Sequence, residues 1–273
     1  MLPMSSSFSA ENIAALRAAR ARHVAIKVVA ETGSTNADLL AAAARLREPT
    51  LLIAENQTAG RGRAGRSWHS EPGATLTFSL AWQFELPPQA LVGLPLAVGT
   101  VIAETLARFD VDARLKWPND VLLGRDKMAG VLIETAPGAP DAPGAQGTQN
   151  TIWAVIGIGI NVLMTEELAE RIGRSVAAAA NLRQRREEVL AALLDNLCAA
   201  LELFERHGFA VFSERWNQLH AWHGMPVVVI DHGQILHRGS ARGVDDQGHL
   251  LLDTAEGRIA VVAGDVSLRG AEG

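Results

Sequence analysis

The stretch from Ile152 to Ile160 most constrains the fold of this chain of 273 residues, because it is apolar at both alternations of a strand. A strand with one face in water alternates apolar and polar residues, whereas a strand covered on both faces is one apolar run. We therefore predict that residues 152–160 form the central strand of a sheet with cover on both sides. Gly157 and Gly159 leave room for something against the backbone, and Asn161 closes the strand.

Further segments can supply the rest of the sheet and its cover. Strands are expected at residues 24–29, 51–54, 76–84, 121–123 and 131–135, and helices at residues 9–22, 37–46, 90–108, 165–172, 186–206 and 209–220. Apolar residues occupy every second position from 76 to 84, which predicts a strand with one buried face. Ser9 is the expected cap of the first helix, and Pro95 should kink the helix at 90–108 or mark its true start.

Connections between these elements are also suggested by composition. Residues 115–120 contain a proline turn, and residues 126–130 are expected to be a tight connection into the strand at 131–135. Residues 137–150 hold three prolines and three glycines with one charge, so they are expected to form a surface loop that joins two strands.

From Pro226 onwards the sequence changes to short strands separated by turn residues. The strands are expected at 227–230, 234–244, 250–253 and 259–262. Spacing this tight predicts a small β-barrel of about fifty residues. We therefore divide the chain into an N-terminal leader (1–23), a main domain (24–221) and a C-terminal barrel domain (222–273).

Charge and cysteine content exclude several classes of protein. The formal net charge is −5, which argues against a protein whose main task is to coat nucleic acid. The single cysteine, Cys198, excludes an intramolecular disulfide and a multi-cysteine zinc site. Its neighbours on the expected helix face are leucines, so Cys198 is predicted to pack in the core.

Neither a membrane span nor a secretory signal stands out in the sequence. We find no uninterrupted apolar run that approaches membrane-spanning length, and residues 1–23 lack the apolar centre of a signal peptide. A soluble cytoplasmic protein is therefore expected. An organellar transit peptide stays open as an alternative, because serines at 5–7 and arginines at 17, 20 and 22 have the matching composition.

The most basic segment runs from Gln57 to Trp68, and in it three arginines alternate with three glycines. Glycine lets the backbone approach a ligand closely, and guanidinium groups pair with phosphate or carboxylate oxygens. The segment has few apolar groups and closely spaced like charges, so we expect a loop that orders on an anion. A solvated basic turn or a nucleic-acid-binding segment would have the same composition, and this loop alone leaves both open.

Polar clusters recur at other strand ends. They are Ser34 to Asn36 at a helix start, Gln57 before the basic loop, Lys116 to Asp120, Lys127 to Gly130, and Gly157 to Asn161. Free backbone N–H groups point outward at a helix start, and simple capping explains one of the three residues there but not all. Cations, amides and glycine backbone together suit a reaction in which charge develops on phosphate.

Two lysines and an aspartate are the candidates for charge at such a site. Lys116 and Lys127 can act as point charges on phosphate or carboxylate, and Asp120 could hold Mg²⁺ between phosphates. The alternatives are a turn lysine in water for Lys127 and a turn aspartate bonded to its own backbone for Asp120. His220 and His223 could share a helix face, but with no nearby third ligand a zinc site is not expected.

In order and spacing, these clusters resemble the biotin protein ligase family. The matching motifs are Gly33-Ser34-Thr35-Asn36, Gly60-Arg61-Gly62-Arg63-Ala64-Gly65-Arg66 with Trp68, Lys116-Trp117-Pro118-Asn119-Asp120, Lys127-Met128-Ala129-Gly130 and Gly157-Ile158-Gly159-Ile160-Asn161. One such motif would be a weak signal, but five in order are specific. The resemblance is strongest over residues 24–165, and Gly264 to Arg269 resembles the end of the family's C-terminal barrel.

The resemblance implies a fold and a reaction. The fold would be α+β, with a mixed sheet, flanking helices and a small C-terminal SH3-like β-barrel. Biotin and MgATP would give biotinyl-5′-adenylate and pyrophosphate, and a lysine of a biotin carboxyl carrier protein would then take the biotinyl group. The residues agree with this, since cations must hold the carboxylate and the α-phosphate together and a loop must shield the mixed anhydride from water.

The resemblance also implies roles for individual residues. Biotin would be bound by Ser34, Thr35, Asn36, Gln57, Gly60, Arg61, Arg63, Lys127, Gly130 and Gly159. ATP would be bound by Arg63, Arg66, Trp68, Lys116, Asn119, Asn161 and Arg269, with Trp68 against adenine. Lys127 and Arg63 would be the catalytic residues, with Lys127 at the junction of carboxylate and phosphate, and Asp120 is the candidate for Mg²⁺.

The chain departs from the family pattern in two places. Many bacterial members carry an N-terminal winged helix-turn-helix that makes them repressors, and the residues before Val24 are expected to be too few to encode one. Ala64 stands where a further arginine is common. We therefore expect a ligase that uses neither nucleic acid nor membrane, with a homodimer left open.

Two other functions are compatible with parts of the pattern. A lipoate or octanoate ligase of the same superfamily would need a long apolar slot, whereas Ser34, Thr35, Asn36 and Gln57 offer donors and acceptors suited to a urea. A non-catalytic biotin sensor or repressor is the second alternative, and it would need a DNA-binding surface.

Overall fold

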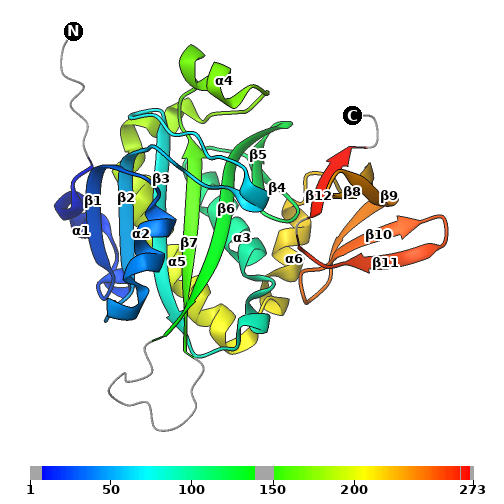
Figure 1. Ribbon diagram of the computed structural model, residues 1–273, viewed down its shortest axis with the longest axis horizontal. Coiled ribbons are helices and arrows are strands. Elements are labelled where there is room, and N and C mark those ends of the chain that lie inside the picture. Colours follow the sequence, from blue (N-terminus) through cyan, green and yellow to red (C-terminus); the bar gives the residue numbers. More distant parts are fainter. Residues whose placement is uncertain (1–7, 139–150, 265, 271–273) are drawn as a thin grey trace.

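The computed structural model describes residues 8–138, 151–264 and 266–270, and it contains a large and a small β-sheet (Figure 1). Three sequence expectations concern residues outside these ranges. They are the serines at 5–7 in the leader, the proline- and glycine-rich loop from 139 to 150, and Asp265 in the C-terminal motif.

The large sheet has seven strands in the order β1-β2-β3-β7-β6-β5-β4. The strands are β1 (Ala25–Thr32), β2 (Thr50–Gln57), β3 (Thr75–Phe84), β4 (Ala113–Lys116), β5 (Asp120–Leu123), β6 (Asp126–Pro137) and β7 (Ile152–Asn161). β1 and β2 pair in parallel, whereas the other neighbouring strands pair antiparallel, so the sheet is mixed. β7 lies between β3 and β6, which confirms the central strand predicted at 152–160.

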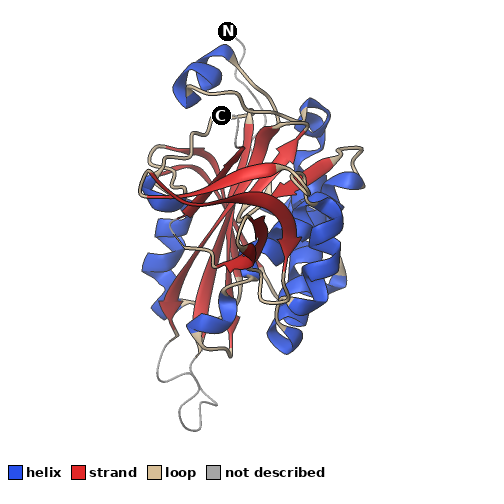
Figure 2. Ribbon diagram, turned by 90° about the vertical axis from the view of Figure 1, so that its right-hand side faces the viewer, coloured by secondary structure: helices blue, strands red, loops and turns tan. Residues whose placement is uncertain are grey.

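Helices lie on both sides of this sheet (Figure 2). They are α1 (Ala10–Leu16), α2 (Thr35–Ala42), α3 (Leu94–Ala107), α4 (Glu166–Ile172), α5 (Arg186–His207) and α6 (Ala210–Leu219), with short 3-10 turns at Ala19–Ala21, Ala43–Arg45, Arg63–Gly65, Pro88–Leu91 and Ala180–Arg185. On one face, Leu39 of α2 clusters with Leu52 and Trp153. On the other, Ile102 of α3 and Leu194 of α5 belong to the larger core. The apolar run of β7 is thereby covered twice, as its sequence requires.

Strand β3 is buried on both faces, so the prediction of a single buried face was wrong. Leu76 and Leu80 are fully buried on the face of the larger core, but Thr77 and Ser79 on the opposite face are only 3% and 0% exposed. α2 covers this second face, and the small polar side chains line a cavity there. Polar alternation in β3 therefore marks a site instead of a solvent-facing surface.

Several boundaries also differ from the sequence analysis. The first helix begins after Ser9, whose hydroxyl accepts the N–H of Asn12 at 3.2 Å as a cap, but it ends at Leu16. Pro95 lies in the first turn of α3 and so marks its start. Residues 126–130 belong to β6 and are not a connection, because the turn lies earlier, at Gly124 with φ +63°.

One helical segment is apolar along most of its length. Residues Pro88–Ala107 reach the length and mean hydropathy (1.8) of a membrane-spanning helix, although Gln89 and Glu104 interrupt the apolar run. Within the protein, 72% of the most apolar window is buried, which is the pattern of a core helix. Cys198 of α5 is also in the core, as predicted, and burial raises the pKa of its thiol to about 12.

The small sheet lies beside α6 and the β4 edge of the large sheet (Figure 1). Its five antiparallel strands are β11 (Gly257–Val261), β10 (Leu250–Thr254), β9 (Gln234–Val244), β8 (Pro226–Asp231) and β12 (Val266–Gly270), in that order. β12 was missed because its partner β8 is distant in sequence. The indole N–H of Trp117 donates to the carbonyl of Gly248 at 3.1 Å, and Asn217 exchanges hydrogen bonds of 3.0 and 2.8 Å with the backbone of Val244. The division at residues 221 and 222 stays a prediction.

Candidate active site

A cavity lies on the α2 face of the large sheet. Its wall combines the start of α2, the end of β2, the basic loop, and strands β3, β6 and β7. The lining residues are Ser34, Thr35, Asn36, Gln57, Arg61, Gly62, Arg63, Trp68, Thr77, Phe78, Ser79, Asn119, Lys127, Gly130, Val131, Leu132, Gly157, Ile158 and Gly159. Each of the five polar clusters found in the sequence contributes to this wall.

The start of α2 brings three predicted residues together with Gln57. The hydroxyl of Ser34 accepts the N–H of Ala37 at 3.4 Å, which is a helix cap. The backbone N–H of Thr35 donates to Oε1 of Gln57 at 2.7 Å, and the Thr35 hydroxyl lies 3.0 Å from the same oxygen. Ser34, Thr35, Asn36 and Gln57 are all buried. Capping therefore accounts for Ser34 alone.

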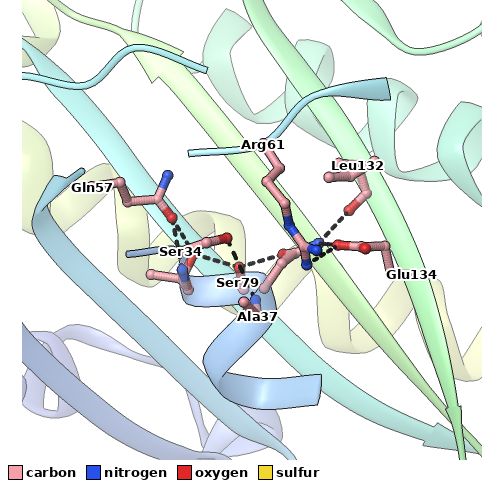
Figure 3. Close-up of polar contacts among 9 residues, drawn as sticks. Ser34, Ala37, Gln57, Arg61, Ser79, Leu132 and Glu134 are labelled. Atoms are coloured by element: carbon pink, nitrogen blue, oxygen red, sulfur yellow. Dashed lines mark hydrogen bonds and ion pairs between the residues drawn. The ribbon is translucent and has the colours of Figure 1, made fainter. Parts of the chain in front are cut away.

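Two residues that the sequence analysis missed extend this wall (Figure 3). Oγ of Ser79 lies 2.6 Å from Oγ1 of Thr35, and the Ser79 hydroxyl donates to Oδ1 of Asn36 at 2.6 Å. Nδ2 of Asn36 donates to Oε2 of Glu134 on β6 at 2.9 Å. The signal for Ser79 was its place in a polar alternation beside the central strand. Glu134 carried no local signal.

The basic loop is held in shape by its own backbone. The N–H of Gly62 donates to the carbonyl of Arg66 at 2.6 Å, and the N–H of Trp68 donates to the carbonyl of Gly60 at 2.9 Å. A Cβ at Gly60 would lie 2.4 Å from the Trp68 carbonyl oxygen, so this close approach requires glycine. Ala64, the departure from the family pattern, has a left-handed φ of 52°.

Two arginines connect this loop to other elements. Nη2 of Arg61 donates to Oε2 of Glu134 at 2.8 Å (Figure 3). Nη1 of Arg63 donates to Oδ1 of Asn119 at 3.1 Å, and the same guanidinium donates to the carbonyl of Gly264. The loop is therefore joined to β6, to the β4–β5 turn and to the segment before β12.

The indole of Trp68 lies between two cavities. The second cavity is lined by Arg66, Ser67, Trp68, His69, Lys127, Asn161, Ile172, Arg174 and Val176. A Cβ at Gly159 would come within 2.2 Å of the indole Cε2, and one at Gly130 would lie 3.9 Å from Cζ3. The indole N–H is buried and has no hydrogen-bond partner among the described residues. Contact of Trp68 with adenine stays a prediction.

Lys127 and Asp120 form a close ion pair across β5 and β6. Nζ of Lys127 lies 2.5 Å from Oδ1 of Asp120, and both side chains are 21% exposed. A Cβ at Gly130 would lie 2.8 Å from this Nζ, so the glycine leaves room for the lysine. The alternatives of a turn lysine in water and of an aspartate bonded to its own backbone are therefore wrong.

Lys116 belongs to the same electrostatic environment. Its Nζ lies 4.3 Å from the centroid of the Trp222 ring. Burial lowers the pKa of Lys116, Asp120 opposes this, and Lys127 and Arg269 add to the lowering. Arg269 itself is exposed on β12. A role for Arg269 in nucleotide binding stays a prediction.

Asn161 offers a polar atom to the second cavity. It is 3% exposed, and its Nδ2 donates to the carbonyl of Ala177 at 3.2 Å. Its buried Oδ1 has no hydrogen-bond partner in the part of the chain that the structure describes. Contact of Asn161 with a nucleotide stays a prediction. Arg66 lies at the exposed rim of the same cavity.

Histidines and metal ligands do not gather at this site. Within residues 8–138, 151–264 and 266–270, no group of three or more His, Cys, Asp or Glu side chains is placed to hold a metal ion. The rings of His220 and His223 have centroids 6.3 Å apart. His220 is buried 4.7 Å from the ring centroid of Trp216, and burial lowers its pKa to about 4.

Comparisons with known proteins agree with this geometry. Profiles of the biotin/lipoate A/B protein ligase family and of the biotin protein ligase C-terminal domain match residues 27–149 and 223–269. The bifunctional ligase/repressor BirA of Escherichia coli is 40% identical over 90% of this chain and 75% of its own length. A biotin–acetyl-CoA-carboxylase ligase of Mycobacterium tuberculosis is 34% identical over 88% of each chain.

A solved structure gives the same result for the fold. The biotin protein ligase of Aquifex aeolicus in complex with biotin and ATP has a TM-score of 0.69 and 29% identity, and the match covers 90% of this chain and 99% of that one. This confirms the predicted mixed sheet with flanking helices and a small C-terminal β-unit. This chain therefore belongs to the biotin protein ligase family.

Proposed function

We propose that this chain activates biotin with ATP in the cavity beside β7 and then passes the biotinyl group to a carrier protein. As a member of its family it is an ATP-dependent, AMP-forming biotin–acetyl-CoA-carboxylase ligase. The acceptor would be a lysine of the biotin carboxyl carrier protein of a carboxylase. The observation that carries the proposal is that the buried polar residues of α2 and Lys127 line one cavity.

The buried polar wall suits the ureido ring of biotin. Ser34, Thr35, Asn36 and Gln57 supply donors and acceptors within it, and Gly130 and Gly159 line the same cavity, whereas Gly60 lies behind it against Gln57 and Trp68. These groups are already hydrogen-bonded to one another, and a lipoyl or octanoyl chain has no polar group to pair with the donors and acceptors that they still offer. The wall therefore favours biotin over lipoate.

Lys127 would act at the reacting atoms in both steps. First, a carboxylate oxygen of biotin attacks the α-phosphorus of ATP, and the bond from this phosphorus to the pyrophosphate oxygen breaks. The cations Lys127, Arg61 and Arg63 offset the repulsion of the two anions. Second, the neutral carrier amine attacks the anhydride carbonyl carbon, the bond to AMP breaks, and the amine loses a proton.

The second cavity would take the nucleotide. Arg66 and Asn161 line it, Trp68 would pack against adenine, and Lys116, Asn119 and Arg269 would address the phosphates and ribose from neighbouring elements. Mg²⁺ commonly binds one or two carboxylates plus substrate phosphates, so the lone carboxylate Asp120 fits an ion that arrives with ATP. The ion, when bound, would neutralise phosphate charge.

Reconstitution tests the proposal directly. The protein is incubated with biotin, ATP, Mg²⁺ and an apo carrier domain, and a carrier whose acceptor lysine is replaced by arginine is the control. We expect one biotinyl group on the normal carrier and none on the control. Excess lipoate should not compete with biotin in a binding titration. A folded protein that leaves the carrier unmodified would contradict the proposal.

We further propose that the ligase is cytoplasmic and acts without nucleic acid, as its net charge of −5 supports. A gel shift with double-stranded DNA at physiological salt, with biotin and ATP present, should show no complex. Sedimentation under the same conditions tests for the homodimer.

A further inference from the structure

Glu134 is a charged residue of the cavity region to which the family resemblance gives no role. It lies on β6, opposite Val155 of β7, and its side chain is 28% exposed. One oxygen, Oε2, accepts from Nδ2 of Asn36 at 2.9 Å and from Nη2 of Arg61 at 2.8 Å (Figure 3). Glu134 therefore touches both the polar wall and the basic loop.

A carboxylate can only accept hydrogen bonds, and this fixes the orientation of the Asn36 amide. Nδ2 of Asn36 donates to Glu134 and, at 3.3 Å, to the carbonyl of Leu132. Both amide hydrogens are used in this way. Oδ1 of Asn36 consequently faces Ser79, whose hydroxyl donates to it at 2.6 Å.

The number of donor hydrogens also fixes the direction of the hydrogen bonds between Ser79, Thr35 and Gln57. Because the Ser79 proton is committed to Asn36, its 2.6 Å contact with Thr35 requires the Thr35 hydroxyl to be the donor, so this one proton is not also donated to Oε1 of Gln57, which lies 3.0 Å from the same hydroxyl. Oε1 of Gln57 then accepts the backbone N–H of Thr35 at 2.7 Å. In the relay from Thr35 through Ser79 and Asn36 to Glu134, each side chain thus donates to the next, and the last of them, Glu134, can only accept.

The orientation of the Asn36 amide decides which hydrogen bonds Asn36 can form with a ligand. With both N–H groups used, Asn36 has only the second lone pair of Oδ1 left, so it can accept a hydrogen bond but cannot donate one. A cyclic urea presents N–H groups at its edge and satisfies such an acceptor. A ligand with a carbonyl or ether oxygen at this place would face another acceptor and lose affinity.

We propose that Glu134 is a positioning residue that determines the specificity of the biotin site by holding Asn36 as the acceptor for a ureido N–H. The proposal rests on the assignment of this cavity to biotin. Arg61 offsets the charge of Glu134 and ties the basic loop to the same oxygen. Glu134 acts through Asn36 and does not touch the reacting carboxylate, whose expected partner Lys127 lies elsewhere in the wall.

The test compares two substitutions of Glu134 in the full chain. Glu134→Ala removes the acceptor, and we expect the biotin Kd and the KM for biotin to rise about tenfold, while kcat at saturating biotin changes less than about twofold. Glu134→Gln keeps an oxygen at this position and should return the Kd to within about threefold of the parent value. The matched control is Glu104→Ala, which removes the partner of Arg215 away from the cavity and should leave Kd unchanged.

A double-mutant cycle shows whether Glu134 acts through Asn36. In an Asn36→Ala background, Glu134→Ala should change Kd less than about twofold, because the group that it orients is gone. A tenfold rise in that background, or equal Kd values for Glu134→Ala and the parent, would overturn the proposal. So would a Glu134→Gln variant as weak as Glu134→Ala, since charge would then matter and not the acceptor.

Two further measurements keep the outcome clear. If the parent protein neither binds biotin nor forms adenylate, the assignment of the cavity fails, whereas an active parent with an unchanged Glu134→Ala variant refutes only the role of Glu134. If Glu134→Ala does not fold, Ser79→Ala tests the relay from the other side of Asn36. A raised Kd supports the relay, and an unchanged Kd refutes it.

Discussion

The indole of Trp68 lies directly over the backbone of Gly159, where a Cβ would come within 2.2 Å of Cε2. No side chain except that of glycine fits this contact without moving the indole or the strand. Because Trp68 borders both cavities, its position sets the boundary between the proposed biotin and nucleotide sites. Gly159 of β7 therefore helps to determine the shape of the site.

Gly159→Ala should consequently displace Trp68 and damage catalysis with little effect on folding. We expect kcat/KM for biotin-dependent pyrophosphate exchange to fall at least about tenfold, since a small misplacement at a site is costly. The control is Gly99→Ala in α3, where the new Cβ would meet Leu115 at an ordinary 3.5 Å. This control should be active and about 0.5–1 kcal/mol more stable. Full activity of Gly159→Ala would contradict the argument.

Lys127→Ala should separate binding from chemistry. The variant is expected to keep its biotin affinity within a few-fold of the parent value, because the buried polar wall proposed to bind the ureido ring is intact. It should form adenylate about 10²–10³ times more slowly. Single-turnover formation of biotinyl-adenylate measures this rate. Lys27→Ala, on the exposed side of β1, is the matched control and should react at the parent rate. Equal rates for Lys127→Ala and the parent would remove Lys127 from its role.

Arg63→Ala should let the activated intermediate escape. Its guanidinium joins the basic loop to Asn119 and to the carbonyl of Gly264, so its loss should loosen the loop. We expect biotinyl-adenylate to be released about tenfold faster, measured by biotin labelling of a bystander protein without a carrier domain. Arg125→Ala, in the exposed turn before β6, is the control. Unchanged bystander labelling would show that the loop is not a lid.

His220 should make stability depend on pH. Burial lowers its folded pKa to about 4 from the ordinary value of 6.5, and its ring nitrogens have no hydrogen-bond partner in the described ranges. Between these values the unfolded chain binds the proton and the folded one does not, so stability falls as pH falls. The expected loss from pH 7.5 to pH 5 is about 2 kcal/mol in urea unfolding.

The comparison of two substitutions isolates this effect. His220→Phe keeps a ring beside Trp216 and should lack the loss, whereas His237→Gln on the exposed start of β9 should retain it. A His220→Phe protein with the parent's pH dependence would assign the loss to other groups.

Local patterns were sufficient for most elements of the fold. The apolar run of β7 predicted a strand with two covered faces, Ser9 and Pro95 marked helix starts, and the polar clusters at strand ends predicted where the site residues lie. The misses have a common cause. The short strand β12 and the second buried face of β3 depend on partners that pack from distant parts of the chain.

The sequence by itself determined the family, the reaction class and the residues that carry charge, because these follow from motifs within a few positions of one another. Only the tertiary structure decided which groups meet. Asn36 reaches Ser79 across 43 positions and Glu134 across 98, and no local period records such pairs. Burial of α2 against β3 and β7 brings these residues together, and the hydrogen bonds that they form fix which groups of Asn36 donate and which accept.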